Sequence, residues 1–155
     1  MRRTGTLGLL LWMALAAQAC AAPVEDRGEA PSAIELGSGR LAFEGFDAAR
    51  TVELTAGPQG GWHVYVSARV FATSLDGGLL EYEARREAEP VAIGAMRVPL
   101  DETRATWSGE AWERCGDVLV LRIASPSDVV GRELAIRVGF GGVSDSQTVL
   151  VVDEQ

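Results

Sequence analysis

The sequence contains no lysine, no asparagine and a single histidine, His63. Without asparagine the chain offers no acceptor for Asn-linked glycans, and without lysine it has no lysine nucleophile. With one histidine, a zinc or copper site would lack the several nitrogen or sulfur ligands that these metals favour. These absences predict a protein without a resident metal or cofactor.

Catalytic patterns are also scarce. Ser67 follows His63 by four residues on one face of a predicted strand, roughly 13 Å away at about 3.3 Å per residue, which is too far for a hydrogen bond. The chain has no Gly-x-Ser-x-Gly elbow and no phosphate-binding loop. A Cys115–His63 dyad, with Arg114 lowering the pKa of the thiol, would need a tertiary contact. We therefore predict a non-catalytic protein and keep a Cys/His-dependent enzyme as an alternative.

Two acidic motifs have both a functional and a structural interpretation. Glu81 and Glu83 lie about 6.6 Å apart on one face of a strand, which loosely matches the carboxylates of inverting glycosidases. A solvated face balanced by Arg85 and Arg86 is the interpretation that we favour. Asp145, near the glycines at positions 141 and 142, fits either a calcium loop or a hairpin turn.

The N-terminus holds the one long apolar run. Arg2 and Arg3 precede an apolar stretch over residues 7–17, which small residues close. A basic start, an apolar core of roughly 7–15 residues and a small-x-small exit are typical of a secretory signal peptide, and the run is too short for a membrane-spanning helix. We expect a signal peptide over residues 1–19, and export.

Residues 17–20, Ala-Gln-Ala-Cys, resemble the lipobox of bacterial lipoproteins, although the first two depart from its usual Leu-Ala-Gly-Cys form. The resemblance implies that Cys20 is lipidated and anchors the protein to a membrane. Ala21 in the second position implies the outer membrane. Ordinary cleavage after Ala19 is the alternative, and it would give a periplasmic or secreted soluble protein.

Charge and cysteine content limit the partners. Removal of residues 1–19 leaves 12 arginines against 22 acidic residues, a net charge of about −10. An acidic surface repels phosphates, so we expect no nucleic-acid partner. If Cys20 is acylated, Cys115 has no partner within the chain; if it is not, a Cys20–Cys115 disulfide remains open.

The mature chain divides into a tether and one domain. Residues 20–32 contain two prolines, four charged residues and almost nothing to bury, which predicts a flexible tether. Residues 33–155 suffice for a single domain that buries about two-thirds of its unfolded surface.

Apolar and polar residues alternate with a period of two along most of the domain. The pattern predicts strands over residues 51–55 and 62–70, joined by a Gly- and Pro-rich turn over residues 57–61. Residues 118–123 are almost continuously apolar, as in a central strand. Residues 133–138 and 148–152 flank another turn and predict a closing hairpin.

One segment, residues 80–89, is ambiguous. Its composition favours a helix, and Glu81 and Arg85 form a good i,i+4 pair. Its apolar residues also alternate with charged ones, and glycines precede it and Pro90 follows it. We interpret it as a strand with one solvent-facing side.

Seven to nine short strands with regular turn signals predict an all-β fold, an immunoglobulin-like β-sandwich of antiparallel strands. Residues 53–66, which contain Gly-Pro-Gln-Gly-Gly-Trp-His, resemble a segment of small uncharacterised bacterial lipoproteins. Residues 133–152 resemble the last two strands of secreted bacterial immunoglobulin-like modules. These resemblances imply export and a β-sandwich, and they imply no reaction.

Aromatic residues are the candidates for binding. Trp62, Trp107 and Trp112 remain after processing, and aromatic platforms hold sugars or partners in many extracellular sandwiches. Trp107 and Trp112 are five residues apart, so they share a face only if the chain turns between them, near Ser108 and Gly109. Core positions are the alternative, which we favour.

The turn before the second strand has two interpretations. In the structural one, Trp62 enters the core and His63 faces outward. In the functional one, Gln59 and His63 present hydrogen-bond donors beside Tyr65 at a recognition edge. We favour the structural interpretation.

We therefore expect an exported, lipid-anchored, non-catalytic module of the cell envelope or surface that binds a protein or glycan partner. A carbohydrate- or small-ligand-binding β-sandwich is the alternative. It would be favoured by an exposed pocket lined by two or more of Trp62, Tyr65, Trp107 and Trp112. A close Cys115–His63 contact would favour the enzyme.

Overall fold

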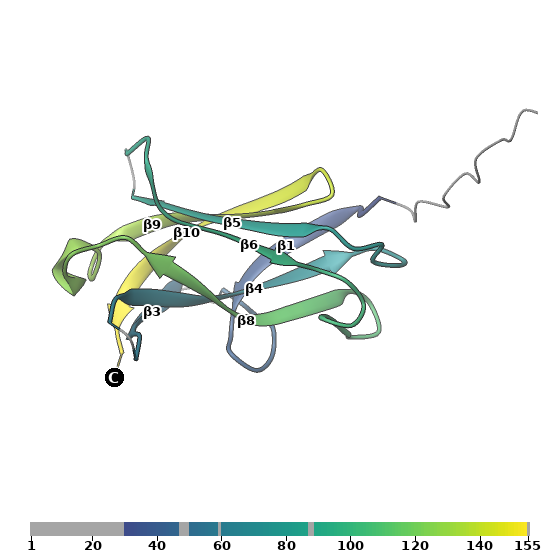
Figure 1. Ribbon diagram of the computed structural model, residues 1–155, viewed down its shortest axis with the longest axis horizontal. Coiled ribbons are helices and arrows are strands. Elements are labelled where there is room, and N and C mark those ends of the chain that lie inside the picture. Colours follow the sequence, from purple (N-terminus) through teal and green to yellow (C-terminus); the bar gives the residue numbers. More distant parts are fainter. Residues whose placement is uncertain (1–29, 47–49, 59, 87–88, 155) are drawn as a thin grey trace, which may run out of the picture.

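The computed structural model describes residues 30–46, 50–58, 60–86 and 89–154 (Figure 1). The predicted signal peptide, the lipidation residue Cys20, the tether up to residue 29 and Gln59 lie outside these residues. Within them the chain is all-β, as predicted, with one short 3₁₀ helix, η1 (Pro126–Asp128). The strands are β1 (Ala33–Ser38), β2 (Glu44–Gly45), β3 (Thr51–Ala56), β4 (Trp62–Phe71), β5 (Leu79–Arg86), β6 (Ala92–Pro99), β7 (Thr106–Trp107), β8 (Trp112–Leu121), β9 (Glu133–Phe140) and β10 (Val143–Asp153).

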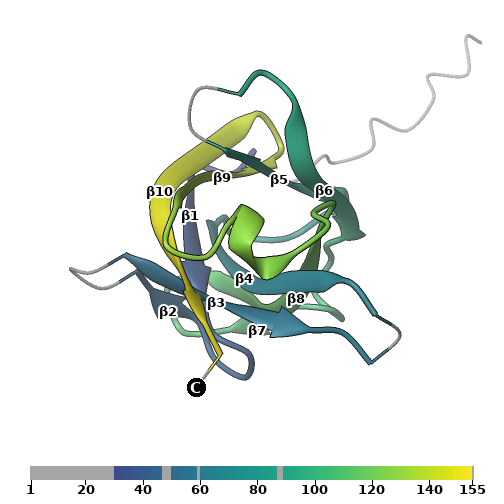
Figure 2. The ribbon, with the colours of Figure 1, turned by 90° about the vertical axis from the view of Figure 1, so that its left-hand side faces the viewer.

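The strands form one curled, mixed sheet with two halves that face each other. In the β4 half, β4 pairs with β1 and β3 on one edge and with β8 on the other, and β2 and β7 extend this half at its margins. In the β9 half, β9 lies between β10 and β5, and β6 follows β5. Viewed from one end, η1 lies between the two halves (Figure 2).

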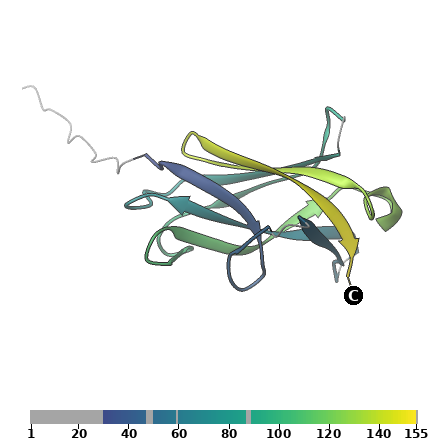
Figure 3. The ribbon, with the colours of Figure 1, turned by 180° about the vertical axis from the view of Figure 1, so that it is seen from behind.

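Strand β3 connects the halves, and it corrects the expectation that every strand is antiparallel. Residues 55 and 56 pair antiparallel with β4, whereas residues 51–54 pair parallel with the end of β10. Figure 3 shows β10 descending from the β9 half to meet β3. Strand β3 crosses from one half of the sheet to the other. Its first part therefore pairs with β10, which runs in the same direction, and its last part pairs with β4, which runs in the opposite direction.

Three further predictions about strands can be compared with the structure. Residues 80–89 were ambiguous, and residues 79–86 are strand β5, which confirms the interpretation as a strand. The expected seven to nine strands are ten, because β2 and β7 are additional pairs of two residues each. Residues 118–123 were expected in a central strand. Residues 118–121 belong to β8 and pair with β4 on one side only, because β7 pairs with β8 only at residues 112 and 113.

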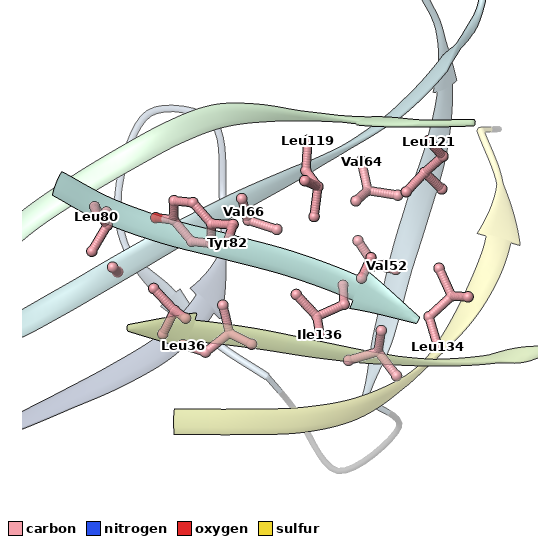
Figure 4. Close-up of a cluster of buried hydrophobic side chains, with 14 of the residues drawn as sticks. Leu36, Val52, Val64, Val66, Leu80, Tyr82, Leu119, Leu121, Leu134 and Ile136 are labelled. Carbon is pink, nitrogen blue, oxygen red and sulfur yellow. The ribbon is translucent and has the colours of Figure 1, made fainter. Parts of the chain in front are cut away.

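The core lies between the halves and follows from the alternation in each strand. Inward residues of both halves are fully or nearly fully buried. Figure 4 shows them meeting between the halves: Leu36, Val52, Val64, Val66, Leu80, Tyr82, Leu119, Leu121, Leu134 and Ile136. Because each is flanked by outward residues, a strand of period two buries one face and leaves the other for contacts outside the core.

Isolated contacts link the two halves at two places where no ladder joins them. At one place, the Arg122 N–H donates to the Ile93 carbonyl at 2.6 Å. Gly94 approaches β8 so closely there that an added Cβ would lie 2.9 Å from the Val120 carbonyl oxygen. At the other place, the Leu36 N–H of β1 donates to the Asp145 carboxylate of β10 at 2.9 Å. Asp145 therefore lies within a strand and bridges two strands.

Candidate functional site

The turn between β3 and β4 is built as its glycines and proline suggest. The Gly57 N–H donates to the Gly61 carbonyl and the Gly60 N–H to the Gly57 carbonyl, both at 3.0 Å. Gly60 and Gly61 have φ values of 84° and 87°, which side chains other than glycine rarely adopt. The turn positions the first residues of β4.

The two faces of β4 are the expected ones, but one of its outward residues is buried. Trp62 is half-buried and packs against the core, as the structural interpretation predicts. His63 points to the opposite face, as expected, but it is only 7% exposed and so does not present an accessible side chain. Two neighbours cover it: its ring packs against that of Tyr65 in a T-shaped arrangement with centroids 5.1 Å apart, and a Cβ added at Gly57 of the turn would lie only 3.7 Å from its Nδ1 atom.

Beside this turn lies a pocket of about 290 Å³ on the outer face of the β4 half, here called the hairpin pocket. Its walls are the turn, the first residues of β4 and two residues of β8: Gly57, Pro58, Gly60, Gly61, Trp62, His63, Tyr65, Val118 and Val120. Val118 and Val120 are 41% and 56% exposed. The pocket therefore brings together Trp62, His63 and Tyr65, three of the predicted site residues, on a largely apolar surface.

One polar atom in this region lacks a partner. The Nε2 atom of His63 is buried and has no hydrogen-bond partner in the part of the chain that the structure describes. An unsatisfied buried polar group costs about 1–3 kcal/mol. A polar group of an occupant, or a water molecule, would remove this cost.

The segment between β1 and β2 covers the remainder of the outer face of β4. The Arg40 guanidinium lies over the Tyr65 ring at 4.5 Å, and the Arg69 guanidinium lies over the Phe43 ring at 4.3 Å. Beneath this segment, the fully buried Ser67 hydroxyl donates to the Gly39 carbonyl at 2.8 Å. Two cation–π contacts and one buried hydrogen bond hold the segment on the sheet.

A second cavity, of about 460 Å³, lies next to this segment and is here called the carboxylate cavity. Arg40, Glu44, Glu53 and Tyr65 are among the residues that line it. Tyr65 therefore belongs to both cavities. Neither Glu44 nor Glu53 has an ion-pair partner among the described residues.

Trp107 and Trp112 form a separate cluster. The chain turns between them, with the Ser108 N–H donating to the Ala111 carbonyl at 2.9 Å, and the two tryptophans are paired across the β7–β8 hairpin. Their rings are 5.2 Å apart between centroids, and Trp107 is 47% exposed. Trp112 pairs with Val70, eight residues along β4 from Trp62 and about 26 Å away. The predicted aromatic residues thus lie at opposite ends of β4.

The structure does not bring Cys115 to His63. The ladder has a register shift at this point, so Cys115 and Gly116 together lie opposite Ser67, four residues along β4 from His63. Burial and then the nearby Glu113 raise the pKa of the Cys115 thiol. Arg114 lowers this pKa as expected, but its contribution is smaller than those that raise it, and its guanidinium is paired with the buried Asp117 at 2.8 Å.

The two glutamates of β5 have individual partners. Glu81 pairs with Arg97 at 2.9 Å, and Glu83 pairs with Arg85. Arg86 pairs with Glu89 instead. These ion pairs fit the interpretation of this face as a solvated charged surface.

Sequence reasoning missed several residues of the outer face. Val118 and Val120 were assigned to a central strand, and the alternation of exposed and buried residues in β8 is hidden in a run that is apolar throughout. Glu44 and Glu53 gave no signal, because isolated glutamates on a surface are common.

Neither the protein-family models nor the curated proteins compared with this chain give a match. Among the described residues, no group of three or more metal-ligating side chains is close enough to hold an ion. None of the helices in the described ranges is long and apolar enough to cross a membrane.

Proposed function

We propose that the protein is an exported, lipid-anchored, non-catalytic module of the cell envelope, held on the outer membrane through Cys20, and that it binds its partner at the hairpin pocket. The observation that carries the proposal is the exposed apolar surface that Val118, Val120 and the hairpin pocket form on an otherwise acidic protein. Contiguous apolar surface on a soluble domain commonly marks a binding site.

The position of the pocket supports this function. Ala33, where the tether meets the domain, pairs with Phe71 at the end of β4, and Trp62 at its beginning borders the pocket. Nine residues of strand separate these points by about 30 Å. The C-terminus also lies at the end of the molecule away from β1's start (Figure 1). A protein anchored at Cys20 would therefore present the pocket away from its own anchor.

A carbohydrate- or small-ligand-binding module is the second candidate. The observation in its favour is that one pocket contains both Trp62 and Tyr65. The pocket volume of about 290 Å³ is near the lower end of the range for small-molecule sites, roughly 300–1,000 Å³. If cleavage leaves Cys20 unmodified, the same binding function would belong to a periplasmic or secreted soluble protein.

We also propose that the fold is an immunoglobulin-like sandwich. The order β1-β4-β8-β7 and the order β5-β9-β10 correspond to the two sheets of that fold, A-B-E-D and C-F-G, and β6 extends the second. An experimental structure in which β6 forms a continuous ladder with β8, closing a barrel, would contradict this assignment.

Mass spectrometry of the N-terminal peptide tests the anchor. The full chain, expressed in a bacterium that processes lipoproteins, should yield a peptide that begins with diacylglyceryl-modified Cys20. An unmodified N-terminus at Cys20 or later would contradict the anchor and favour the soluble form.

Affinity capture from cell envelopes tests the binding site. The full chain, Val120→Ser and the control Val91→Ser are used as baits; Val91 lies elsewhere and is even more exposed than Val120 (69% against 56%). We expect Val120→Ser to lose a partner that the other two retain. If Val120→Ser retains every captured partner, or if Val91→Ser loses the same partner, the proposed site is contradicted. Elution by free envelope oligosaccharides would favour the carbohydrate candidate.

A further inference from the structure

We propose that the outer face of the β4 half binds an extended protein segment with one apolar and one cationic side chain. The apolar side chain enters the hairpin pocket, and the cationic one reaches Glu44 and Glu53 in the carboxylate cavity. This inference rests on the proposed function and names the chemistry of the partner.

The two cavities are adjacent and chemically different. They share Tyr65. Thr55 of β3 pairs with His63 of the hairpin pocket, and Glu53 of the carboxylate cavity lies two residues further along β3. Two residues of strand span about 6.6 Å and the step from β4 to β3 adds about 4.8 Å across the sheet, so Glu53 lies about 8 Å from His63. A long cationic side chain at position i+2 of an extended peptide spans this distance when side chain i fills the hairpin pocket. An extended segment therefore places neighbouring same-face side chains in the two cavities.

The negative charge of the carboxylate cavity favours a cationic side chain there. Glu44 and Glu53 are both exposed, and within the described residues neither has a salt bridge. Arg40 lines the same cavity, but its guanidinium lies over the Tyr65 ring. The cavity therefore has two carboxylates against one guanidinium, and an arginine or lysine of a partner would balance the remaining negative charge.

The hairpin pocket offers both apolar surface and a polar atom to a partner. Val118 and Val120 expose apolar surface next to Trp62, and the buried His63 Nε2 atom has no partner in the described part of the chain. A side chain that fills the pocket would cover the valines. A polar group beside it would satisfy the imidazole.

Other occupants fit this face less well. A second copy would bring a chain of net charge about −10 against the same carboxylates. The tether has three carboxylates, Glu25, Asp26 and Glu29, against one arginine, so its own charge opposes binding to Glu44 and Glu53, and it joins the domain opposite Phe71, about 20 Å along β4 from Tyr65. A sugar would need a free aromatic plane, but Arg40 covers one side of Tyr65 and Trp62 packs against the core.

Selection from a phage-displayed library of random linear peptides tests the proposal. The full chain is immobilised, and the Glu44→Gln, Glu53→Gln double variant serves as the counter-bait. We expect enriched peptides to share an apolar residue with arginine or lysine two positions away, and the double variant to lose this enrichment. Enrichment of acidic or uncharged sequences, or no enrichment, would overturn the proposal.

The dissociation constant of one enriched peptide, labelled with fluorescein, gives the quantitative test. Val120→Ser should weaken binding about tenfold, equivalent to about 1.4 kcal/mol. The glutamine double variant should weaken it and reduce its salt dependence. Val91→Ser and Glu133→Gln, which alter an exposed valine and an exposed glutamate elsewhere, should leave it unchanged. An equal effect of the control variants would contradict the site.

These results separate the two proposals. If no basic–apolar peptide binds but envelope capture still depends on Val120, the partner class is wrong and the proposed function stands. If no such peptide binds and envelope capture is also independent of Val120, both the partner class and the proposed function are wrong.

Discussion

Among single residues, Tyr65 makes the most contacts in the proposed binding site. It lines both cavities, its ring lies beneath the Arg40 guanidinium, and it meets His63 edge-on. A tyrosine combines apolar area with a polar tip and is common at binding surfaces for that reason. Its position on β4 places these contacts on a strand that pairs along both edges, which makes the site rigid.

Gly60→Val tests the turn beside the pocket. Gly60 has a φ of 84° and no atom within 4 Å of an added Cβ, so the cost is backbone strain rather than a clash. We expect a loss of about 1 kcal/mol in the free energy of unfolding, measured by chemical denaturation. Gly45→Ala is the control, because its Cβ would meet one atom at 4.0 Å and its φ is not positive. Equal losses in both variants would contradict the role of the dihedral angle.

The pH dependence of stability tests the cap that Asp128 forms at the start of η1. Hydrogen bonds from the Ser125 and Ala124 N–H groups hold the pKa of Asp128 below its usual 3.8. Because the folded pKa is the lower one, the stabilisation is present above about pH 3.8 and is lost as the pH falls through the folded value. Asp128→Ala should therefore lower the Tm at pH 7 and have progressively less effect in acid.

The control for this prediction is Asp76→Ala, which removes an exposed carboxylate from the loop before β5. Its Tm should follow that of the parent at each pH. A Tm difference for Asp128→Ala that stays constant down to pH 2 would show that the carboxylate charge is not the source of the stabilisation.

At the scale of elements, the segment between β1 and β2 decides how much of the outer face stays open. It covers Ser67 and meets β4 through two arginine–aromatic contacts. A double-mutant cycle on Arg40→Gln and Tyr65→Leu should give a coupling of about 0.5–1 kcal/mol in the free energy of unfolding. Zero coupling would mean that the guanidinium does not hold the segment on the sheet.

The bridge between β1 and β10 is a second test at this scale. Asp145→Ala leaves the Leu36 N–H without its acceptor, and hydrogen bonds to charged groups contribute about 1.5–3 kcal/mol. We expect a loss near the lower figure, because Asp145 is partly exposed. Ser144→Ala, an exposed neighbour on β10, should cost much less. A negligible loss for Asp145→Ala would contradict the bridge.

At the scale of the whole molecule, the local alternation of residues predicts strands but not their neighbours. The patterns over residues 51–55, 62–70 and 133–138 match β3, β4 and β9 because one face of each is buried. The parallel pairing of β3 with β10 joins residues about a hundred positions apart, and no local pattern encodes it. For the same reason the apolar run in β8 was assigned to a central position, although it borders the open side of the sheet.

The candidate site was predicted in part. Trp62, His63 and Tyr65 were chosen from the sequence, and they line one pocket together. The burial of His63 depends on the fold of the adjacent turn, and the contribution of Val118 and Val120 depends on the register between β4 and β8. Both are long-range properties that residue types alone do not specify.

The most direct test of the account is photocrosslinking in living cells, with a photoreactive amino acid at position 118 or at position 91 of the full chain. Both positions are exposed, and only position 118 borders the hairpin pocket. The account predicts a discrete crosslinked species in the envelope fraction from position 118 and none from position 91. Identical crosslinking from both positions, or none from position 118, would contradict the claim that this face binds a partner.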